Sequence, residues 1–64
     1  MTVRLDYDRE TDAAYLRFSD ARVLESEEVS PGLTLDFDAD GKIVALEVLT
    51  AGERLPKDAL IAAE

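Results

Sequence analysis

The stretch PGLTLDFDADGKIVALEVL, residues 31–49, decides the fold of this chain. In its first half, Leu33, Leu35 and Phe37 alternate with polar residues, which is the period of a strand with one buried face. Its second half alternates in the same way, and an Asp- and Gly-rich loop at 38–41 separates the two runs. Two alternating runs joined by such a loop predict a β-hairpin over residues 33–38 and 42–49.

The alternation also predicts how the two strands face each other. If Phe37 and Lys42 close the loop, Leu35 lies opposite Val44, and the apolar residues share one face of the hairpin. A slip of one residue would distribute them over both faces. The expected core face of the hairpin consists of Leu33, Leu35, Val44, Leu46 and Val48.

The remaining segments predict three further strands and a helix. Alternating apolar residues place strands at 3–8 and 13–19, and a pattern interrupted by glutamates places another at 23–29. Pro56 suits the first position of a helix, and the Ala- and Leu-rich residues 57–63 favour its continuation. We therefore expect an α+β, mostly β fold, with about five strands in an antiparallel meander and a short C-terminal helix, in a single domain over residues 1–64.

Composition narrows the classes of partner. The chain has 64 residues, no cysteine, and a net charge of −8 from fifteen acidic and seven basic residues. Such a surface repels nucleic acid phosphates and anionic lipids, so we expect no nucleic acid and no membrane as partner. It attracts basic protein surfaces or divalent cations, although the same charge would also serve solubility and guard the sheet edges. No leader or long apolar run is visible, so we expect a cytoplasmic protein.

The residue types argue against catalysis. Without His or Cys, the chain lacks the usual general base, thiol nucleophile and zinc ligands, and it has no Gly-rich phosphate loop. We therefore expect a protein that is not an enzyme and that uses no cofactor. One acidic cluster offers metal ligands, but a solvated turn explains its members as well: Asp6, Asp8, Glu10 and Asp12.

A calcium-loop pattern also occurs in the hairpin. Asp36, Asp38, Asp40, Gly41 and Glu47 satisfy the spacing of an EF-hand loop. An EF-hand needs a helix on each side, whereas both flanks here alternate with the period of strands. In a hairpin, Glu47 lies ~17 Å along the returning strand from the turn, too far to complete a coordination sphere with the aspartates. We therefore expect a turn and no metal site, with weak surface chelation by Asp38 and Asp40 as the alternative.

Three segments resemble a known family of short bacterial proteins. They are residues 7–18, residues 25–32 and residues 35–44, with the sequences YDRETDAAYLRF, ESEEVSPG and LDFDADGKIV. The resemblance is to the family catalogued as domain of unknown function 2283, and it extends from Val3 to about Leu55. It implies a small β-rich fold and carries over no catalytic residue. An association of this family with small toxin–antitoxin-like proteins implies a role in partner binding.

Two classes of function follow from these observations. The first is a non-catalytic protein-interaction module, antitoxin-like in kind, that binds a small basic protein through acids that the hairpin leaves outward: Glu25, Glu27, Glu28, Asp36 and Asp38. The second is a protein that binds a cation or small ligand through its acidic turns. We also expect a homodimer, because a sheet this small leaves two edges and apolar residues on both faces, with Ile43 and Leu49 opposite the core face.

Overall fold

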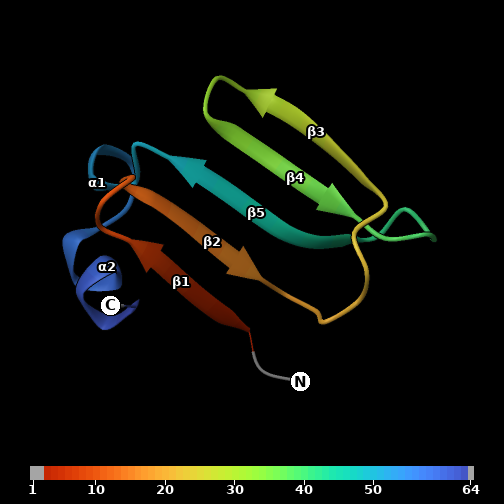
Figure 1. Ribbon diagram of the computed structural model, residues 1–64, viewed down its shortest axis with the longest axis horizontal. Coiled ribbons are helices and arrows are strands. Elements are labelled where there is room, and N and C mark those ends of the chain that lie inside the picture. Colours follow the sequence, from red (N-terminus) through yellow and green to blue (C-terminus); the bar gives the residue numbers. More distant parts are fainter. Residues whose placement is uncertain (1–2, 64) are drawn as a thin grey trace.

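The computed structural model describes residues 3–63 as one five-stranded antiparallel sheet with two short helices after the last strand (Figure 1). The predicted sheet and C-terminal helix are therefore confirmed. The elements are β1 (Arg4–Asp8), β2 (Ala13–Arg17), β3 (Glu25–Ser30), β4 (Leu33–Phe37), β5 (Ile43–Leu49), α1 (Ala51–Arg54) and α2 (Lys57–Ala63).

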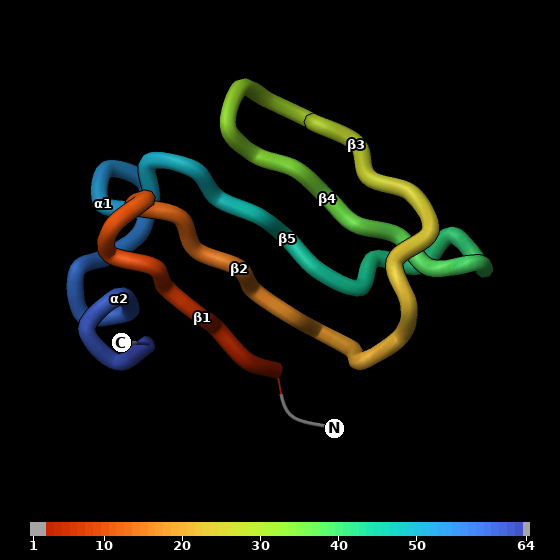
Figure 2. Tube along the Cα trace, viewed as in Figure 1, coloured from red at the N-terminus to blue at the C-terminus, as the bar shows by residue number. Residues whose placement is uncertain are grey.

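The strand order differs from a simple meander. The sheet runs β1-β2-β5-β4-β3, so the last strand lies in the centre, between β2 and β4. β3, β4 and β5 follow one another as neighbours, but the segment 18–24 must pass around the end of the sheet to bring the chain from β2 to the far edge (Figure 2). It is tied there by hydrogen bonds from Phe18 N–H to the Val44 carbonyl and from Leu24 N–H to the Phe37 carbonyl, both of 2.8 Å.

The predicted register of the central hairpin is wrong by two residues. Leu35 lies opposite Leu46, not Val44, and Phe37 lies opposite Ile43, with an irregularity after Asp36. The loop is longer than predicted because the Asp38 carboxylate accepts hydrogen bonds from two loop amides beyond it, and the Asp38 N–H bonds to the Lys42 carbonyl at 3.0 Å. A shift of two residues preserves the face of each side chain, which is why the predicted core face survives the error.

Helix α1 was not predicted, since its four residues include a glycine and follow directly on β5. Thr50 adopts a left-handed backbone, with φ 54°, that turns the chain into the helix. Asp12, in the β1–β2 turn, holds the start of α1: its carbonyl accepts the Ala51 N–H at 2.8 Å and its carboxylate accepts the Gly52 N–H at 2.9 Å. The same carboxylate oxygen accepts the Tyr7 hydroxyl at 2.7 Å. Asp12 is thus a structural residue that joins the first turn of the sheet to the helices.

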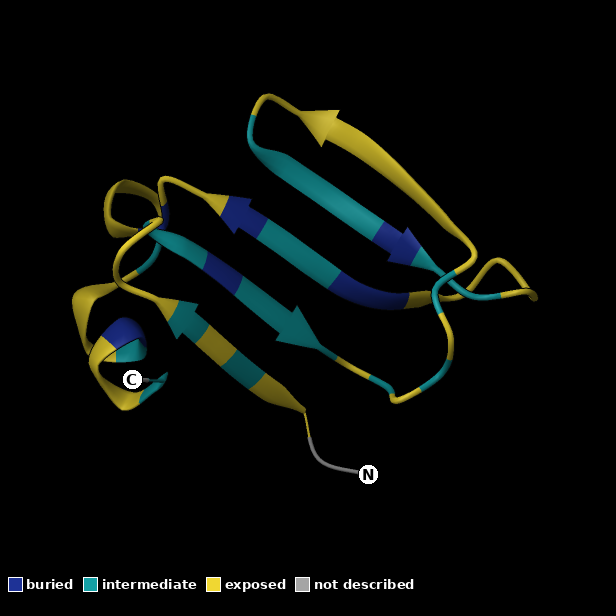
Figure 3. Ribbon diagram, in the orientation of Figure 1, coloured by how far each residue is buried: buried dark blue, intermediate teal, exposed yellow. Residues whose placement is uncertain are grey.

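Helix α2 begins at Lys57, one residue after the predicted first position at Pro56, ends at Ala63 as predicted, and covers one end of the sheet, beside β1 (Figure 1). Its buried residue, Leu60, packs with Ala14, Val48 and Ala51, and Leu55 lies against this cluster. Most of β2 and β4 is only half-buried, because a single sheet with helices at one end leaves much of its surface near solvent (Figure 3).

The two faces of the sheet differ in character. The helix face carries the cluster just described and Leu5, Leu16, Leu33, Leu35 and Leu46 of the strands, whereas the open face carries Tyr15, Asp36, Glu47 and Leu49. Within residues 3–63, no helix is long and apolar enough to cross a membrane.

Candidate functional site

Strand β3 is an edge strand whose six residues are all exposed (Figure 3). Glu25 lies opposite Phe37 and Glu27 opposite Leu35, so both glutamates are on the helix face, and Glu28 is on the open face opposite Thr34. We call Glu25, Glu27 and Glu28 the acidic edge.

The glutamates of the acidic edge are largely free of contacts inside the fold. The Glu28 carboxylate accepts the Gly32 N–H at 3.3 Å, which supports the β3–β4 turn. For Glu25 and Glu27, no side-chain hydrogen bond or ion pair occurs with any described residue. Their charge is therefore available to a partner.

Asp36 does not face solvent, so its predicted outward position is wrong. The side chain is only 3% exposed. One carboxylate oxygen accepts the Tyr15 hydroxyl at 2.7 Å and the other accepts the Ser26 hydroxyl at 2.6 Å. The alternation correctly placed Asp36 opposite the core leucines, but the open face is covered at this point by side chains from β2 and β3.

Asp38, the fifth predicted contact residue, is half-buried and stabilises the hairpin loop. Its Oδ1 accepts the N–H groups of Asp40 and Lys42, each at 2.9 Å. Gly41, with φ 78°, supplies the left-handed position that the loop requires. The five predicted residues therefore divide into three on the acidic edge and two that serve the fold.

The residues with the spacing of a calcium loop, 36–47, do not form one. Strands, not helices, flank the loop, and Asp36 is engaged with two hydroxyls while Asp38 is engaged with loop amides. Glu47 lies on β5 opposite Tyr15 and Thr34. Among residues 3–63, no group of three acidic side chains is arranged to hold a metal ion.

The hydrogen-bonded group of Tyr15, Asp36 and Ser26 was not foreseen from the sequence. Tyr15 and Asp36 lie on β2 and β4, on either side of β5, and Ala45 of β5, fully buried and opposite Asp36, leaves room for the tyrosine to reach the carboxylate. Burial, and then the hydrogen bond to Asp36, raise the pKa of Tyr15 above its ordinary value. The alternation did place Tyr15 and Asp36 opposite the apolar face of their strands, but their contact depends on a strand order that the sequence does not reveal.

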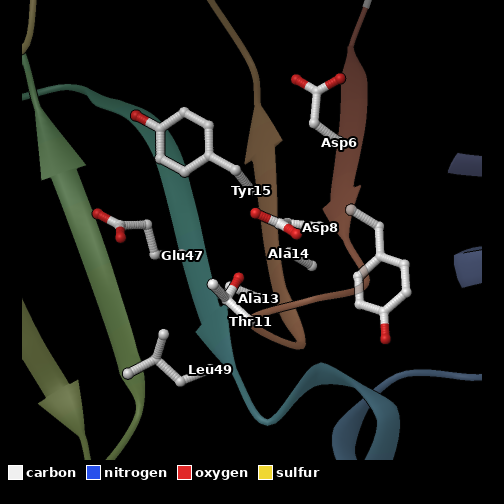
Figure 4. A pocket seen from close by; sticks show the side chains of 9 residues that line it. Asp6, Asp8, Thr11, Ala13, Ala14, Tyr15, Glu47 and Leu49 are labelled. Atoms are coloured by element: carbon white, nitrogen blue, oxygen red, sulfur yellow. The ribbon is translucent and has the colours of Figure 1, made fainter. Parts of the chain in front are cut away.

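A shallow groove of about 290 Å³ lies on the open face (Figure 4). Its lining includes side chains from three neighbouring strands: Asp6 and Asp8 of β1, Tyr15 of β2 and Glu47 of β5. Asp6 accepts a hydrogen bond from Arg4 at 3.2 Å, and the Asp8 carboxylate accepts the Glu10 N–H at 3.0 Å. The predicted acidic cluster is thus divided, with Asp6 and Asp8 at the groove and Asp12 at the helices.

Together these features describe a class: a small acidic protein built on one antiparallel sheet, with an open edge strand and helices on one face. Within that class, the chain belongs to the family described as a protein of unknown function (DUF2283), whose model matches residues 4–51. The matched segment contains all five strands and ends where α1 begins. Neither the curated proteins nor the solved structures give a match.

Proposed function

We propose that the protein is a non-catalytic interaction module of the cytoplasm that binds a small basic protein, as an antitoxin-like module would, through the acidic edge. The observation that carries this proposal is the exposure of all six residues of β3, together with carboxylates of Glu25 and Glu27 that make no hydrogen bond or ion pair with residues 3–63. Six exposed residues on an edge strand form a surface that a partner can cover without displacing any part of the fold.

The geometry favours binding by strand addition. An edge strand presents backbone N–H and C=O groups with which an extended segment of another protein can pair, while alternate side chains determine specificity. Glu25 and Glu27 project on one face, so the complementary strand would carry Lys or Arg at alternate positions on that face.

The partner strand is not β3 of a second copy. Antiparallel pairing of two β3 strands about their centre would set Glu27 opposite Glu28 of the other copy, and like charges in directly opposed positions are destabilising. The acidic edge therefore disfavours pairing with the same strand of a second copy and favours pairing with a basic segment.

Affinity purification from the native host tests this proposal with charge reversals. The variant Glu25→Lys/Glu27→Lys changes the acidic edge, and Glu10→Lys/Glu53→Lys makes the same change of charge at exposed positions in the β1–β2 turn and α1. We expect the wild type and the control to recover one small basic protein and the edge variant to lose it.

Two outcomes would contradict the proposal. Recovery of the same partner by all three proteins would place the binding surface elsewhere. Equal loss in both variants would show that net charge, not the edge strand, governs the interaction.

A second candidate function rests on the groove of the open face. Asp6, Asp8 and Glu47 line it beside the Tyr15 ring. No three acidic side chains among residues 3–63 are arranged to hold a metal ion, so their negative charge would attract a cation only loosely. A calcium titration followed by amide chemical shifts tests it: shifts confined to these residues and lost in Asp8→Asn/Glu47→Gln would support it. We expect no site tighter than roughly millimolar, because few carboxylates at an exposed surface bind calcium weakly.

A further inference from the structure

Four leucines form a continuous row across the helix face of the sheet. Cross-strand pairing sets Leu5 beside Leu16, Leu16 beside Leu46, and Leu46 beside Leu35. We call these four residues the leucine row. It crosses β1, β2, β5 and β4 in their spatial order and ends at Glu27 on β3.

The helices bury the row beside this one, and of the leucine row only Leu5 and Leu46 pack against the helix cluster. Ala14 and Val48, which pair across β2 and β5, are buried under Ala51 and Leu60. All four members of the leucine row are only half-buried, and Leu16 and Leu35 are not among the residues packed against the helix cluster. The leucine row is therefore only half-buried, although buried residues of β5 lie on both sides of it, Val48 toward the helices and Val44 away from them.

The protein exposes more surface than its mass predicts. A folded monomer of 7.0 kDa has about 4,000 Å² of accessible surface, and this chain has 4544 Å². Its core is correspondingly thin, because three of the six buried apolar residues in the described part of the chain are alanines: Ala14, Ala45 and Ala51. Domains of this size normally gain the missing burial from disulfides, metals or association, and the chain has no cysteine.

We propose that a second copy of this chain covers the leucine row, giving a symmetric homodimer packed through the helix faces of two sheets. The Cα positions span 33 × 28 × 17 Å, a slab whose broad face is large enough for a standard interface of roughly 800 Å² per partner. A symmetric dimer requires a surface that matches itself, and a row of one residue type satisfies that condition.

The occupant is a second copy because the deficit in burial belongs to the fold itself. A different protein would stabilise the chain only when that protein is present, whereas another copy is present wherever the chain folds. The proposal does not depend on the acidic edge, since its contacts are apolar and lie on four other strands.

Salt separates this association from the binding proposed above. Two copies of charge −8 repel each other, and screening weakens that repulsion, so the dimer should tighten as salt is added. A complex with a basic partner should weaken under the same change.

Sedimentation velocity over a range of protein concentrations tests the dimer. We expect the wild type to sediment as a dimer at high micromolar concentration. Leu16→Gln/Leu35→Gln should sediment as a monomer, and Leu49→Gln, at a half-exposed leucine on the open face, should remain dimeric. A wild type that stays monomeric, or a Leu49→Gln variant that alone loses the dimer, would overturn the proposal.

A measurement on the wild type guards against misfolding of the leucine-row variant. In a mixture of labelled and unlabelled chains, isotope-filtered spectra should show contacts between chains from the methyl groups of Leu16 and Leu35. Contacts between chains that involve only other residues would assign the dimer to a different surface and so refute the leucine row. Their complete absence at high concentration would do the same.

Discussion

At the scale of single residues, Asp36 shows how a carboxylate in a small sheet can serve stability. It is buried, and each of its oxygens accepts a hydroxyl, one from β2 and one from β3. The hydrogen bond between Tyr15 and Asp36 thus connects β2 and β4, which are not neighbours in the sheet, and Ser26 adds a bond from the edge strand β3. The hydrogen bond between the tyrosine of β2 and the aspartate of β4 crosses the central strand β5 on the open face of the sheet.

Asp36→Ala should lower the free energy of unfolding by about 1–3 kcal/mol, because it leaves the Tyr15 and Ser26 hydroxyls without their acceptor. Asp40→Ala is the control, since Asp40 is exposed and surface changes usually stay within about 0.5 kcal/mol. Urea denaturation measures both. Equal stability of the two variants would show that the buried carboxylate contributes nothing.

Tyr15 predicts a dependence of stability on alkaline pH. Its pKa in the folded protein is raised above the ordinary 10.0, first by burial and then by Asp36, so the fold favours the protonated phenol. The resulting stabilisation is complete below pH 10.0 and is lost as the pH rises through the folded-state pKa. Tyr15→Phe should show a smaller loss of stability than the wild type over that alkaline range. Parallel curves for the two proteins would contradict the prediction.

At the scale of elements, helix α2 is joined to the sheet by a single buried side chain, Leu60. Seven residues are too few for a stable helix in isolation, so α2 depends on this contact. Leu60→Ala should cost about 2–5 kcal/mol. The adjacent Ile61, 60% exposed, provides the control, and Ile61→Ala should change stability by less than about 0.5 kcal/mol. Thermal unfolding followed by circular dichroism distinguishes them, and similar losses in both would argue against docking through Leu60.

The elements were the most predictable part of the structure. Period-two alternation located β1, β4 and β5 because one face of each strand must be apolar. The register between β4 and β5 was harder to predict from the sequence. The hydrogen bonds of Asp38 lengthen the loop, and the pattern of alternation is unchanged by a shift of two residues. Helix α1 was not predicted because four residues are too few to show the 3.6-residue periodicity of a helix, and its start depends on Asp12, which is distant in the sequence.

At the scale of the whole molecule, strand order decides the candidate sites. The open groove, the buried Asp36 and the leucine row all depend on β5 lying between β2 and β4. Residue patterns do not encode that order, because each strand is compatible with several neighbours. The acidic edge was predictable in part, since Glu25, Glu27 and Glu28 interrupt the apolar pattern, whereas the role of Asp36 required the assembled sheet.

Opposite responses to salt are the clearest prediction for the whole molecule. Raising salt screens exposed charges beyond ~8 Å at physiological ionic strength. Sedimentation equilibrium of the protein alone should show tighter self-association at high salt, and capture of a basic partner should weaken over the same range. A dimer that weakens with salt would indicate ionic contacts between copies in place of the leucine row.

The central position of β5 also has a consequence for synthesis of the chain. Translation delivers β1 and β2 first, then β3 and β4, but these two pairs of strands share no pairing until residues 43–49 emerge. Until then β2 and β4 each present an unpaired edge, with which another chain can pair. Closure of the sheet must therefore await the last strand, and a chain interrupted before residue 43 would leave two separate hairpins with nothing to unite them.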